Sequence, residues 1–344
     1  MKKSTVIVTG GCGYIGSHTL IQLAKKGYDV ISIDNYSRSS PKNLDYVHRV
    51  LGSKSILNHN IDLNSRSDVF ELFRTISKPF SVIHFAAFKS VPESVINPSI
   101  YYNNNIISLL NTLDASLEYG ATSFVFSSSC SVYGDIKELP VSECTPLCTP
   151  QSPYAFTKVI GESIINDYFD AFGMNSICLR YFNPVGAHPS GLIGETPFGT
   201  PNNLFPVLTQ TLIGLRESMQ VFGGTLPTRD GSCIRDYVHV LDIANAHVSA
   251  LNYLDHQTHC REIINLGSGS GTSVFEAISM LESITNLKLN YAVAQPREGD
   301  VTEIYSNCEK ARSLLNWSPI YNLKDIVTSA WNWERELAKR NSAE

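Results

Sequence analysis

The 344-residue sequence predicts an α/β protein with a doubly wound parallel sheet and a smaller C-terminal α/β domain. Short apolar runs alternate with helical patterns, which is typical of parallel strands joined by right-handed crossovers. The apolar runs cover residues 5–9, 29–33, 55–59, 81–85, 123–127 and 175–180, and the helical patterns cover 66–77, 98–118 and 155–172.

A glycine-rich turn follows the first apolar run. Gly10, Gly13 and Gly16 stand between residues 5–9 and a helical pattern that runs to Gly27, a typical C-cap. Strand, glycine turn and helix are the context of a Rossmann dinucleotide-binding fingerprint. Gly10 would allow the tight turn, Gly13 would let the backbone approach a pyrophosphate, and Gly16 would permit close packing of helix on strand. The N–H groups at the helix start would hold the phosphates. A glycine turn without a ligand is the alternative.

The second run, residues 29–33, ends in Asp34, which lies 18 residues after Gly16. A carboxylate there accepts hydrogen bonds from both ribose hydroxyls and repels a 2′-phosphate. The sequence therefore predicts NAD rather than NADP, and Arg38 is the one residue nearby that argues for NADP.

A tyrosine and a lysine stand four residues apart at Tyr154 and Lys158, one turn apart on a predicted helix. An ammonium beside a phenol favours the phenolate and lowers a pKa that is ordinarily about 10, which makes the tyrosine a usable base. Such pairs are common on surfaces. Here, however, a serine-rich loop at residues 127–131 ends a predicted strand, where open α/β sheets bind ligands.

Composition narrows the possible partners and compartments. A net charge of −5 with mixed signs argues against nucleic acid. No segment approaches 18 consecutive apolar residues, and Gly10 and Gly11 interrupt the run after the N-terminal lysines, so we expect neither a membrane span nor a signal peptide. Eight cysteines without a C-x-x-C pair fit reduced thiols in a cytoplasm.

One cluster has metal-like spacing. His256, His259 and Cys260 lie within five residues, between a helical pattern and an apolar run. A polar connecting loop is the simpler interpretation because no second ligand pair follows, so we expect no metal.

After Tyr181 the pattern changes. Residues 184–203 are rich in proline and glycine and show no periodicity, which predicts a binding loop or lid. Short strands near 221–222 and 263–264 then mix with helices near 204–217, 240–254, 273–285 and 323–338. We expect a dinucleotide domain over residues 1–180 and a mainly substrate-binding part over 181–344, some of whose segments return to the sheet.

These features resemble the extended short-chain dehydrogenase/reductase family over nearly the whole chain. Asp62 in Asn60-Ile61-Asp62-Leu63, the run His84-Phe85-Ala86-Ala87 and Tyr-x-x-x-Lys all match that family. Within it the sequence is most similar to the UDP-galactose 4-epimerases, on the longer motifs at 180–189, 201–204, 235–240 and 297–300.

The resemblance implies a C4 epimerisation of UDP-hexoses with a recycled NAD. Tyr154 would take the C4 hydroxyl proton as the hydride passes to NAD, with Lys158 and Ser129 as its partners. The 4-keto sugar would turn over and take the hydride back on its other face. The implied cofactor contacts are Gly10, Gly13, Tyr14, Ile15, Gly16, Asp34, Asn35, Asp62, Leu63, Phe85, Ala86, Ala87, Lys89, Asn104, Ser127, Tyr154, Lys158 and Tyr181.

The resemblance also implies the substrate contacts. Arg235 and Arg297 would hold the diphosphate, Asp300 the uridine ribose and Phe222 the uracil, since a guanidinium suits phosphate oxygens. Ile304 would wall the pocket beside the sugar C2 substituent, and its stiff β-branch predicts weaker turnover of N-acetylated sugars. The alternatives are that Ile304 is an ordinary core residue or that Tyr305 forms the wall instead. The full set is Lys89, Ser129, Ser131, Tyr154, Phe182, Asn183, Asn203, Leu204, Phe222, Arg235, Tyr237, Arg297, Asp300 and Ile304.

Three other functions stay open. A 4,6-dehydratase shares the oxidation step but places an Asp-Glu pair where this chain has Cys130 and Ser131. Decarboxylation of a nucleotide uronic acid would leave the motif at 180–189 unexplained. An NAD-sensing protein without catalysis would have no need for the serine, tyrosine and lysine together. By resemblance we also expect a homodimer that pairs through the helices near 98–118 and 155–172.

Overall fold

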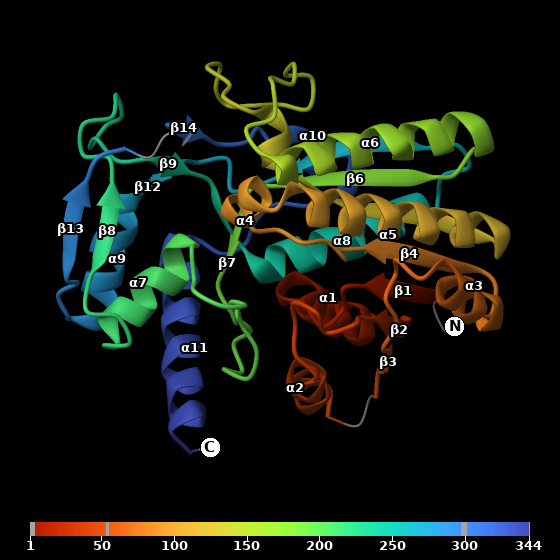
Figure 1. Ribbon diagram of the computed structural model, residues 1–344, viewed down its shortest axis with the longest axis horizontal. Helices are drawn as coiled ribbons and strands as arrows, with labels where there is room; N and C mark the ends of the chain where they lie inside the picture. The colour runs from red at the N-terminus through yellow and green to blue at the C-terminus, as the bar shows by residue number, and fades with distance from the viewer. Residues whose placement is uncertain (1–3, 53–54, 297–300, 344) are drawn as a thin grey trace.

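The computed structural model describes residues 4–52, 55–296 and 301–343 (Figure 1). Within them, seven strands form one parallel sheet in the order β11-β6-β5-β4-β1-β2-β3. The strands are β1 (Thr5–Thr9), β2 (Asp29–Ile33), β3 (Leu57–His59), β4 (Phe80–His84), β5 (Ala121–Ser129), β6 (Ser176–Tyr181) and β11 (Arg261–Leu266). The order reverses between β1 and β4, which is the switch point where such sheets bind ligands. The predicted doubly wound fold is confirmed.

Helices cover both faces of this sheet because successive strand residues point to opposite sides. Val6 and Val8 pack with α1 (Tyr14–Lys25), α2 (Pro41–Leu51), α8 (Val240–Leu254) and α10 (Glu309–Leu315). Ile7, between them, packs on the other side with α3 (Arg66–Thr75), α5 (Pro98–Glu118) and α6 (Pro153–Phe172). Two apolar cores therefore enclose the sheet.

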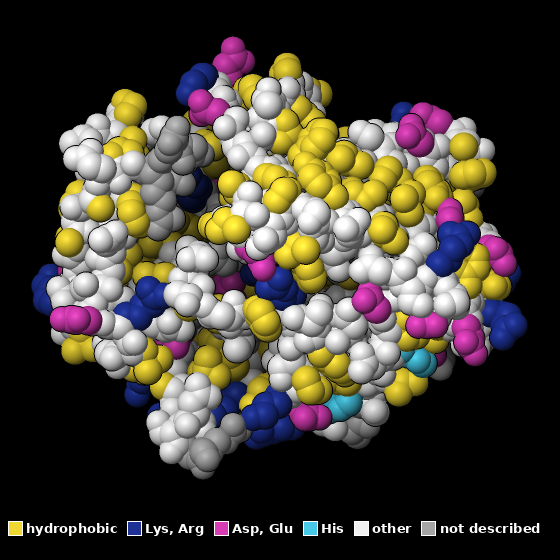
Figure 2. All heavy atoms as spheres, viewed as in Figure 1, with side chains coloured by type: hydrophobic (Ala, Val, Ile, Leu, Met, Phe, Trp, Pro, Cys, Tyr) yellow, Lys and Arg dark blue, Asp and Glu magenta, His cyan; other side chains and the backbone are white. Residues whose placement is uncertain are grey.

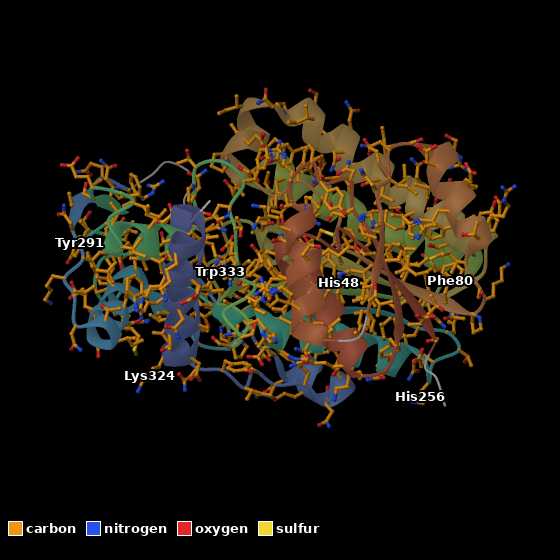
Figure 3. All side chains as sticks on the ribbon, turned by 90° about the horizontal axis from the view of Figure 1, so that it is seen from below. His48, Phe80, His256, Tyr291, Lys324 and Trp333 are labelled. Atoms are coloured by element: carbon orange, nitrogen blue, oxygen red, sulfur yellow. The ribbon has the colours of Figure 1, made fainter. Side chains whose placement is uncertain are left out.

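The C-terminal half forms a smaller α/β part to one side of the sheet (Figure 1). Its core packs α7 (Leu204–Leu212), α9 (Val274–Thr285) and α11 (Leu323–Ala343) around short strands. These pair as β7 (Asn183–Val185) with β10 (Tyr237–His239), β8 (Met219–Phe222) with β13 (Tyr291–Ala294), and β9 (Ile234–Arg235) with β12 (Thr272–Ser273) and β14 (Glu303–Ile304). Figure 3 shows Tyr291 of β13 and Phe80 of β4 toward opposite ends of the long axis.

Two helix ends show how local chemistry sets the boundaries. Ser152 accepts a hydrogen bond from the Ala155 N–H at 3.1 Å and Pro153 takes the first position, so α6 begins just before the tyrosine–lysine pair. The helix predicted at 204–217 ends at Leu212 instead, because Gly214 adopts a φ of 85° that stops it. None of the helices in the described ranges is both long and apolar enough to cross a membrane.

Candidate functional site

A cavity of about 1040 Å³ lies at the carboxyl ends of the central strands. Gly10 after β1, Asp34 after β2, Phe85 after β4 and Ser129 at the end of β5 all line it. The cavity continues to the C-terminal part, where Arg235 of β9 lines it as well. One space thus joins the glycine turn to the predicted substrate segments.

The glycine turn has the shape that a dinucleotide needs. Gly10 has a φ of +67°, and a Cβ there would lie 2.8 Å from the Ala86 nitrogen. A Cβ on Gly16 would overlap the Gly10 carbonyl, so helix α1 could not pack this close to the turn. Gly13 caps α1 without a side chain, which leaves the N–H groups of its first turn for an anion. Each predicted role of these glycines is thus consistent with the geometry.

The carboxylate of Asp34 is held in place at the cavity edge. It accepts hydrogen bonds from the Cys12 and Tyr36 N–H groups, both at 2.9 Å, and from the Ser39 hydroxyl at 2.8 Å. These donors come from the glycine turn and from the loop after β2. The carboxylate is therefore oriented before any ribose arrives.

Arg38, the residue that argued for NADP, already has a carboxylate as its ion-pair partner. Its guanidinium forms an ion pair with Glu93 of α4 (Val91–Ile96), with 2.7 Å between Nη2 and Oε1. The same guanidinium lies 4.5 Å from the centre of the Phe88 ring. A 2′-phosphate would have to compete with this carboxylate, so the arrangement favours NAD.

Ser129, Tyr154 and Lys158 all line the cavity. Lys158 Nζ donates to the Ser127 carbonyl at 2.7 Å and lies 5.9 Å from the centre of the Tyr154 ring. Burial raises the pKa of Tyr154 to about 12, against the effect of its hydrogen bond with Ser129. The predicted lowering of this pKa by Lys158 is not found, because desolvation dominates and the ammonium is turned to a carbonyl.

A buried ion pair lies behind Lys158. Arg180 binds both oxygens of Glu162, at 2.8 and 2.6 Å, and the Ser128 hydroxyl donates to the same carboxylate at 2.5 Å. Burial lowers the pKa of Lys158 to about 8, and the charge of Glu162 acts in the opposite direction. Sequence reasoning missed Glu162, although it follows Lys158 by four residues, the same spacing that connects Tyr154 and Lys158.

The predicted substrate residues lie at the other end of the cavity. Phe182, Asn183, Asn203, Leu204, Phe222, Arg235 and Tyr237 all line it. Asn183 Oδ1 is buried and has no hydrogen-bond partner among the described residues, as expected of an acceptor that waits for a ligand donor. Lys89 and Asn203 both contact Glu195 Oε1, at 3.1 and 2.8 Å. Glu195 also lines the cavity and was not predicted.

Each residue of the predicted cofactor set lines the cavity. The substrate prediction fits in part. Arg297 and Asp300 lie outside the described residues. Ser131 is not a lining residue; its N–H donates to the Ser129 hydroxyl at 3.2 Å instead.

Ile304 was predicted to wall the sugar pocket, and it is not among the residues that line the cavity. It is 5 % exposed and belongs to a buried cluster with Val132, Tyr133, Val141 and Phe182. Of these, Phe182 lines the cavity and Ile304 does not. Ile304 of β14 pairs with Arg235 of β9, which lines the cavity, so Ile304 belongs to the layer behind the cavity wall.

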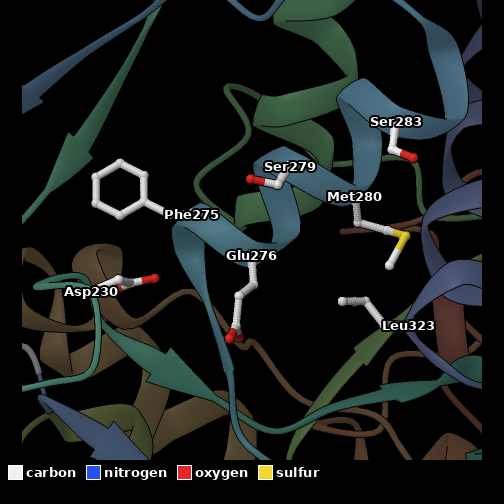
Figure 4. Close-up of a pocket in the computed structure, with 7 residues that line it drawn as sticks. All are labelled: Asp230, Phe275, Glu276, Ser279, Met280, Ser283 and Leu323. Atoms are coloured by element: carbon white, nitrogen blue, oxygen red, sulfur yellow. The ribbon is translucent and has the colours of Figure 1, made fainter.

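A second pocket, of about 470 Å³, lies against α9 (Figure 4). Both of its carboxylates have partners: Glu276 pairs with Arg229, and Asp230 accepts from the Ser232 hydroxyl at 2.8 Å. Across the described ranges, no three His, Cys, Asp or Glu side chains are grouped to hold a metal ion. The large cavity is therefore the candidate site.

Comparisons with known proteins agree with this geometry. A family model described as GDP-mannose 4,6 dehydratase matches residues 7–330. The chain is 43% identical to UDP-glucose 4-epimerase 2 of Arabidopsis thaliana over 97% of its own length and 95% of the relative's. It is 42% identical to a UDP-glucose 4-epimerase of Schizosaccharomyces pombe over the same shares.

Two solved structures that match the chain are also UDP-glucose 4-epimerases. A UDP-glucose 4-epimerase from Stenotrophomonas maltophila, with bound NAD and formylated UDP-arabinopyranose, matches with a TM-score of 0.93 and 37% identity over 98% of this chain and 99% of that one. The enzyme from Bifidobacterium longum, in complex with NAD⁺ and UDP, matches with a TM-score of 0.92 and 39% identity over 96% and 98%.

Proposed function

This chain belongs to the UDP-glucose 4-epimerase family of the extended short-chain dehydrogenases/reductases, and on that premise we propose that it interconverts UDP-galactose and UDP-glucose with NAD. The observation that carries the proposal is one cavity that contains the glycine turn, Asp34 and the group Ser129, Tyr154 and Lys158. A phenol and a lysine beside a dinucleotide site are suited to moving the proton of a sugar hydroxyl.

In the proposed reaction the Tyr154 oxygen takes the C4 hydroxyl proton of the sugar and returns it after the sugar has turned over. The Ser129 hydroxyl shares the hydrogen bond to the sugar oxygen. When bound, NAD⁺ supplies a reversible hydride acceptor and a positive charge close to the phenol. Because burial raises the pKa of Tyr154 to about 12, such a charge is needed for the phenol to act as a base near neutral pH.

Dehydration is the closest alternative, since the matching family model is named for a dehydratase. Elimination of water needs an additional acid and base next to the catalytic hydroxyl. Burial raises the pKa of the Cys130 thiol to about 12, and Ser131 does not line the cavity. Neither side chain is suited to that proton transfer, so these two positions favour epimerisation.

The direct test incubates the purified protein with UDP-galactose and measures the UDP-glucose formed. We expect conversion to an equilibrium mixture without net NADH release. A protein that carries NAD but converts no UDP-galactose would support the NAD-sensing alternative. A 4-keto-6-deoxy sugar as product would support dehydration.

The first prediction concerns the cofactor. Because the hydride is returned within the same turnover, NAD should stay bound, and the purified protein should release NAD(H) on denaturation. Mass and absorbance of the released molecule identify it. A protein that is active yet releases no dinucleotide would contradict the proposed cycle.

The second prediction concerns sugar specificity. We propose that the chain prefers UDP-glucose and UDP-galactose over the N-acetylhexosamine pair. Because Ile304 belongs to the buried cluster that includes Phe182, replacing Ile304 with tyrosine should overpack this cluster and lower the free energy of unfolding by about 1–3 kcal/mol. Urea unfolding measures this loss. Competition between UDP-galactose and UDP-N-acetylgalactosamine measures the specificity of the wild type and of Ile304→Tyr. If the variant discriminates more sharply than the wild type and is equally stable, Ile304 lines the sugar pocket directly.

We also propose a homodimer that forms through α5 and α6. Exposed apolar side chains, among them Ile100 and Ile107 of α5 and Phe156 and Phe172 of α6, lie on these helices. Figure 2 shows hydrophobic side chains gathered over this region of the molecule. Sedimentation of the wild type and of Ile107→Glu tests the interface. A wild type that sediments as a monomer at micromolar concentration would exclude the dimer.

Arg235 is proposed to bind the diphosphate, together with Arg297, while Asp300 is proposed to bind the uridine ribose. We propose a cytoplasmic location because all eight cysteines are free and five of them are buried.

A further inference from the structure

Arg38 lies between two aromatic rings at the rim of the cavity. The centre of its guanidinium is 4.5 Å from the Phe88 ring centroid and 4.8 Å from that of Phe198. Its ion pair with Glu93 holds it there, and Glu93 is itself fixed by the Tyr101 hydroxyl, which donates to Oε2 at 2.8 Å. The guanidinium is thus held by one carboxylate and two rings.

The two rings belong to different parts of the chain. Phe88 follows β4, on the dinucleotide side, whereas Phe198 lies in the segment 186–203 between β7 and α7. Arg38 itself comes from the loop after β2. The stack therefore connects the segment to two loops of the dinucleotide side.

A second contact crosses between the same two parts. Lys89 Nζ lies 3.1 Å from Glu195 Oε1, and the Trp333 indole N–H donates to the Glu195 carbonyl at 2.8 Å. Trp333, on α11, is labelled in Figure 3. The segment is therefore anchored to α11 at Glu195, near its middle.

Beyond Glu195 the segment has little backbone support. No backbone–backbone hydrogen bond connects residues 196–202 to any other described residue. Phe198 is 65 % exposed and also lines the cavity, so it lies at the boundary between the cavity and solvent. The position of this stretch therefore depends on side-chain contacts, of which the stack on Arg38 is one.

We propose that Phe88, Arg38 and Phe198 form a clamp that holds the 196–202 stretch over the bound dinucleotide and slows its release. Arg38 acts as a positioning residue here, because it holds the stretch in place rather than the reacting atoms. The inference rests on the proposed function in that the retained ligand is NAD. An enzyme that recycles its cofactor gains from slow release, whereas a dehydrogenase must exchange it.

The test measures how fast NAD leaves the purified holoenzyme, as exchange of bound cofactor for isotopically labelled NAD⁺. A cation–π contact at a partly exposed site is worth about two- to fivefold in an equilibrium constant, so Phe198→Ala should speed exchange by about that factor. Arg38→Gln removes both ring contacts and the ion pair, and should speed exchange on the order of tenfold or more. Phe198→Trp keeps the stack and should exchange at the wild-type rate or more slowly.

Leu215→Ala is the matched control, because Leu215 is also exposed, belongs to the same half of the chain and does not line the cavity. Equal exchange rates for wild type, Phe198→Ala and Arg38→Gln would overturn the clamp. Faster exchange in Leu215→Ala as well would also overturn it, since loosening would then not depend on the stack. If the wild type carries no dinucleotide at all, the proposed function fails rather than the clamp.

Discussion

Replacing Tyr154 with phenylalanine should lower the turnover of UDP-galactose by on the order of 10²–10⁴ and leave NAD bound. The substitution removes one oxygen and keeps the ring, so packing around position 154 is almost unchanged. The lost oxygen is the proposed proton acceptor, and its described hydrogen-bond partner is Ser129. The reduction should appear in kcat more than in KM, because the proton moves only in the reaction step.

Tyr28→Phe provides the matched control for this measurement. Its hydroxyl donates to Asn252 Oδ1 at 2.7 Å, and Tyr28 does not line the cavity, so the same atom is lost far from the site. Steady-state kinetics and the NAD content of both variants should be measured together. Near-wild-type turnover in Tyr154→Phe would remove Tyr154 from its proposed role, and loss of NAD from that variant would point to a binding role instead.

Acid should unfold this protein steeply, between about pH 5 and 4, because four histidines are buried in their neutral form. Burial lowers the pKa of His18 and His84 to about 3 and the pKa of His239 and His247 to about 4. In the unfolded chain these groups bind protons below about pH 6.5, whereas the folded protein takes them up only near pH 3–4. The unfolded state therefore binds more protons in this window, and stability falls as the pH falls.

The loss of stability in acid follows from the difference in bound protons between the unfolded and the folded state. Each histidine removes about 1.4 kcal/mol per pH unit in the window, so four of them remove about 11 kcal/mol within roughly two units, which is comparable to a typical stability of about 5–15 kcal/mol. Asp242 opposes part of this loss, because burial raises its pKa to about 6 and its folded form gains a proton first. Burial also raises the pKa of Asp236 and of Glu334, which act in the same direction. The effect of the histidines is larger, so the folded protein still loses stability as the pH falls.

Circular dichroism as a function of pH measures the acid midpoint. His247→Gln removes one of the four groups and should move the midpoint to lower pH. The substitution can also change the stability at neutral pH, so that change is measured separately and subtracted from the stability of the variant at each pH. His256→Gln, at an exposed position, is the control. An unfolding midpoint below pH 3, or one that His247→Gln leaves unchanged after this correction, would contradict the explanation.

The fold and most of the cavity were predictable because they depend on local signals. The apolar runs that become β1, β2 and β4 are visible within five residues each, and the cavity residues follow directly at their carboxyl ends. Gly10 and Asp34 could be identified in this way. Parallel strands bring their ends to one edge, so residues that are distant in sequence meet without any further information.

What could not be predicted depends on side-chain contacts between distant segments. Glu162 meets Arg180 across 18 residues, and Arg38 meets Glu93 across 55, in both cases because helices and strands were first placed by the core. The burial of Ile304 behind the cavity wall could not be predicted for the same reason. A two-residue strand pairing with β9 decides which way its side chain points, and no periodicity in the sequence carries that information.

The position of β11 has a consequence for how the chain is made. Its partner β6 is finished at Tyr181, but β11 ends only at Leu266, 85 residues later. At a synthesis rate of about 5–20 residues per second, β6 stays an unpaired edge strand on the ribosome for several seconds or more. An edge containing Ile177 and Leu179, both fully buried in the finished protein, is a ready template for pairing with another nascent chain. Aggregation during synthesis is therefore the hazard that this order of strands creates, and a fragment that stops near residue 180 would carry that hazard permanently.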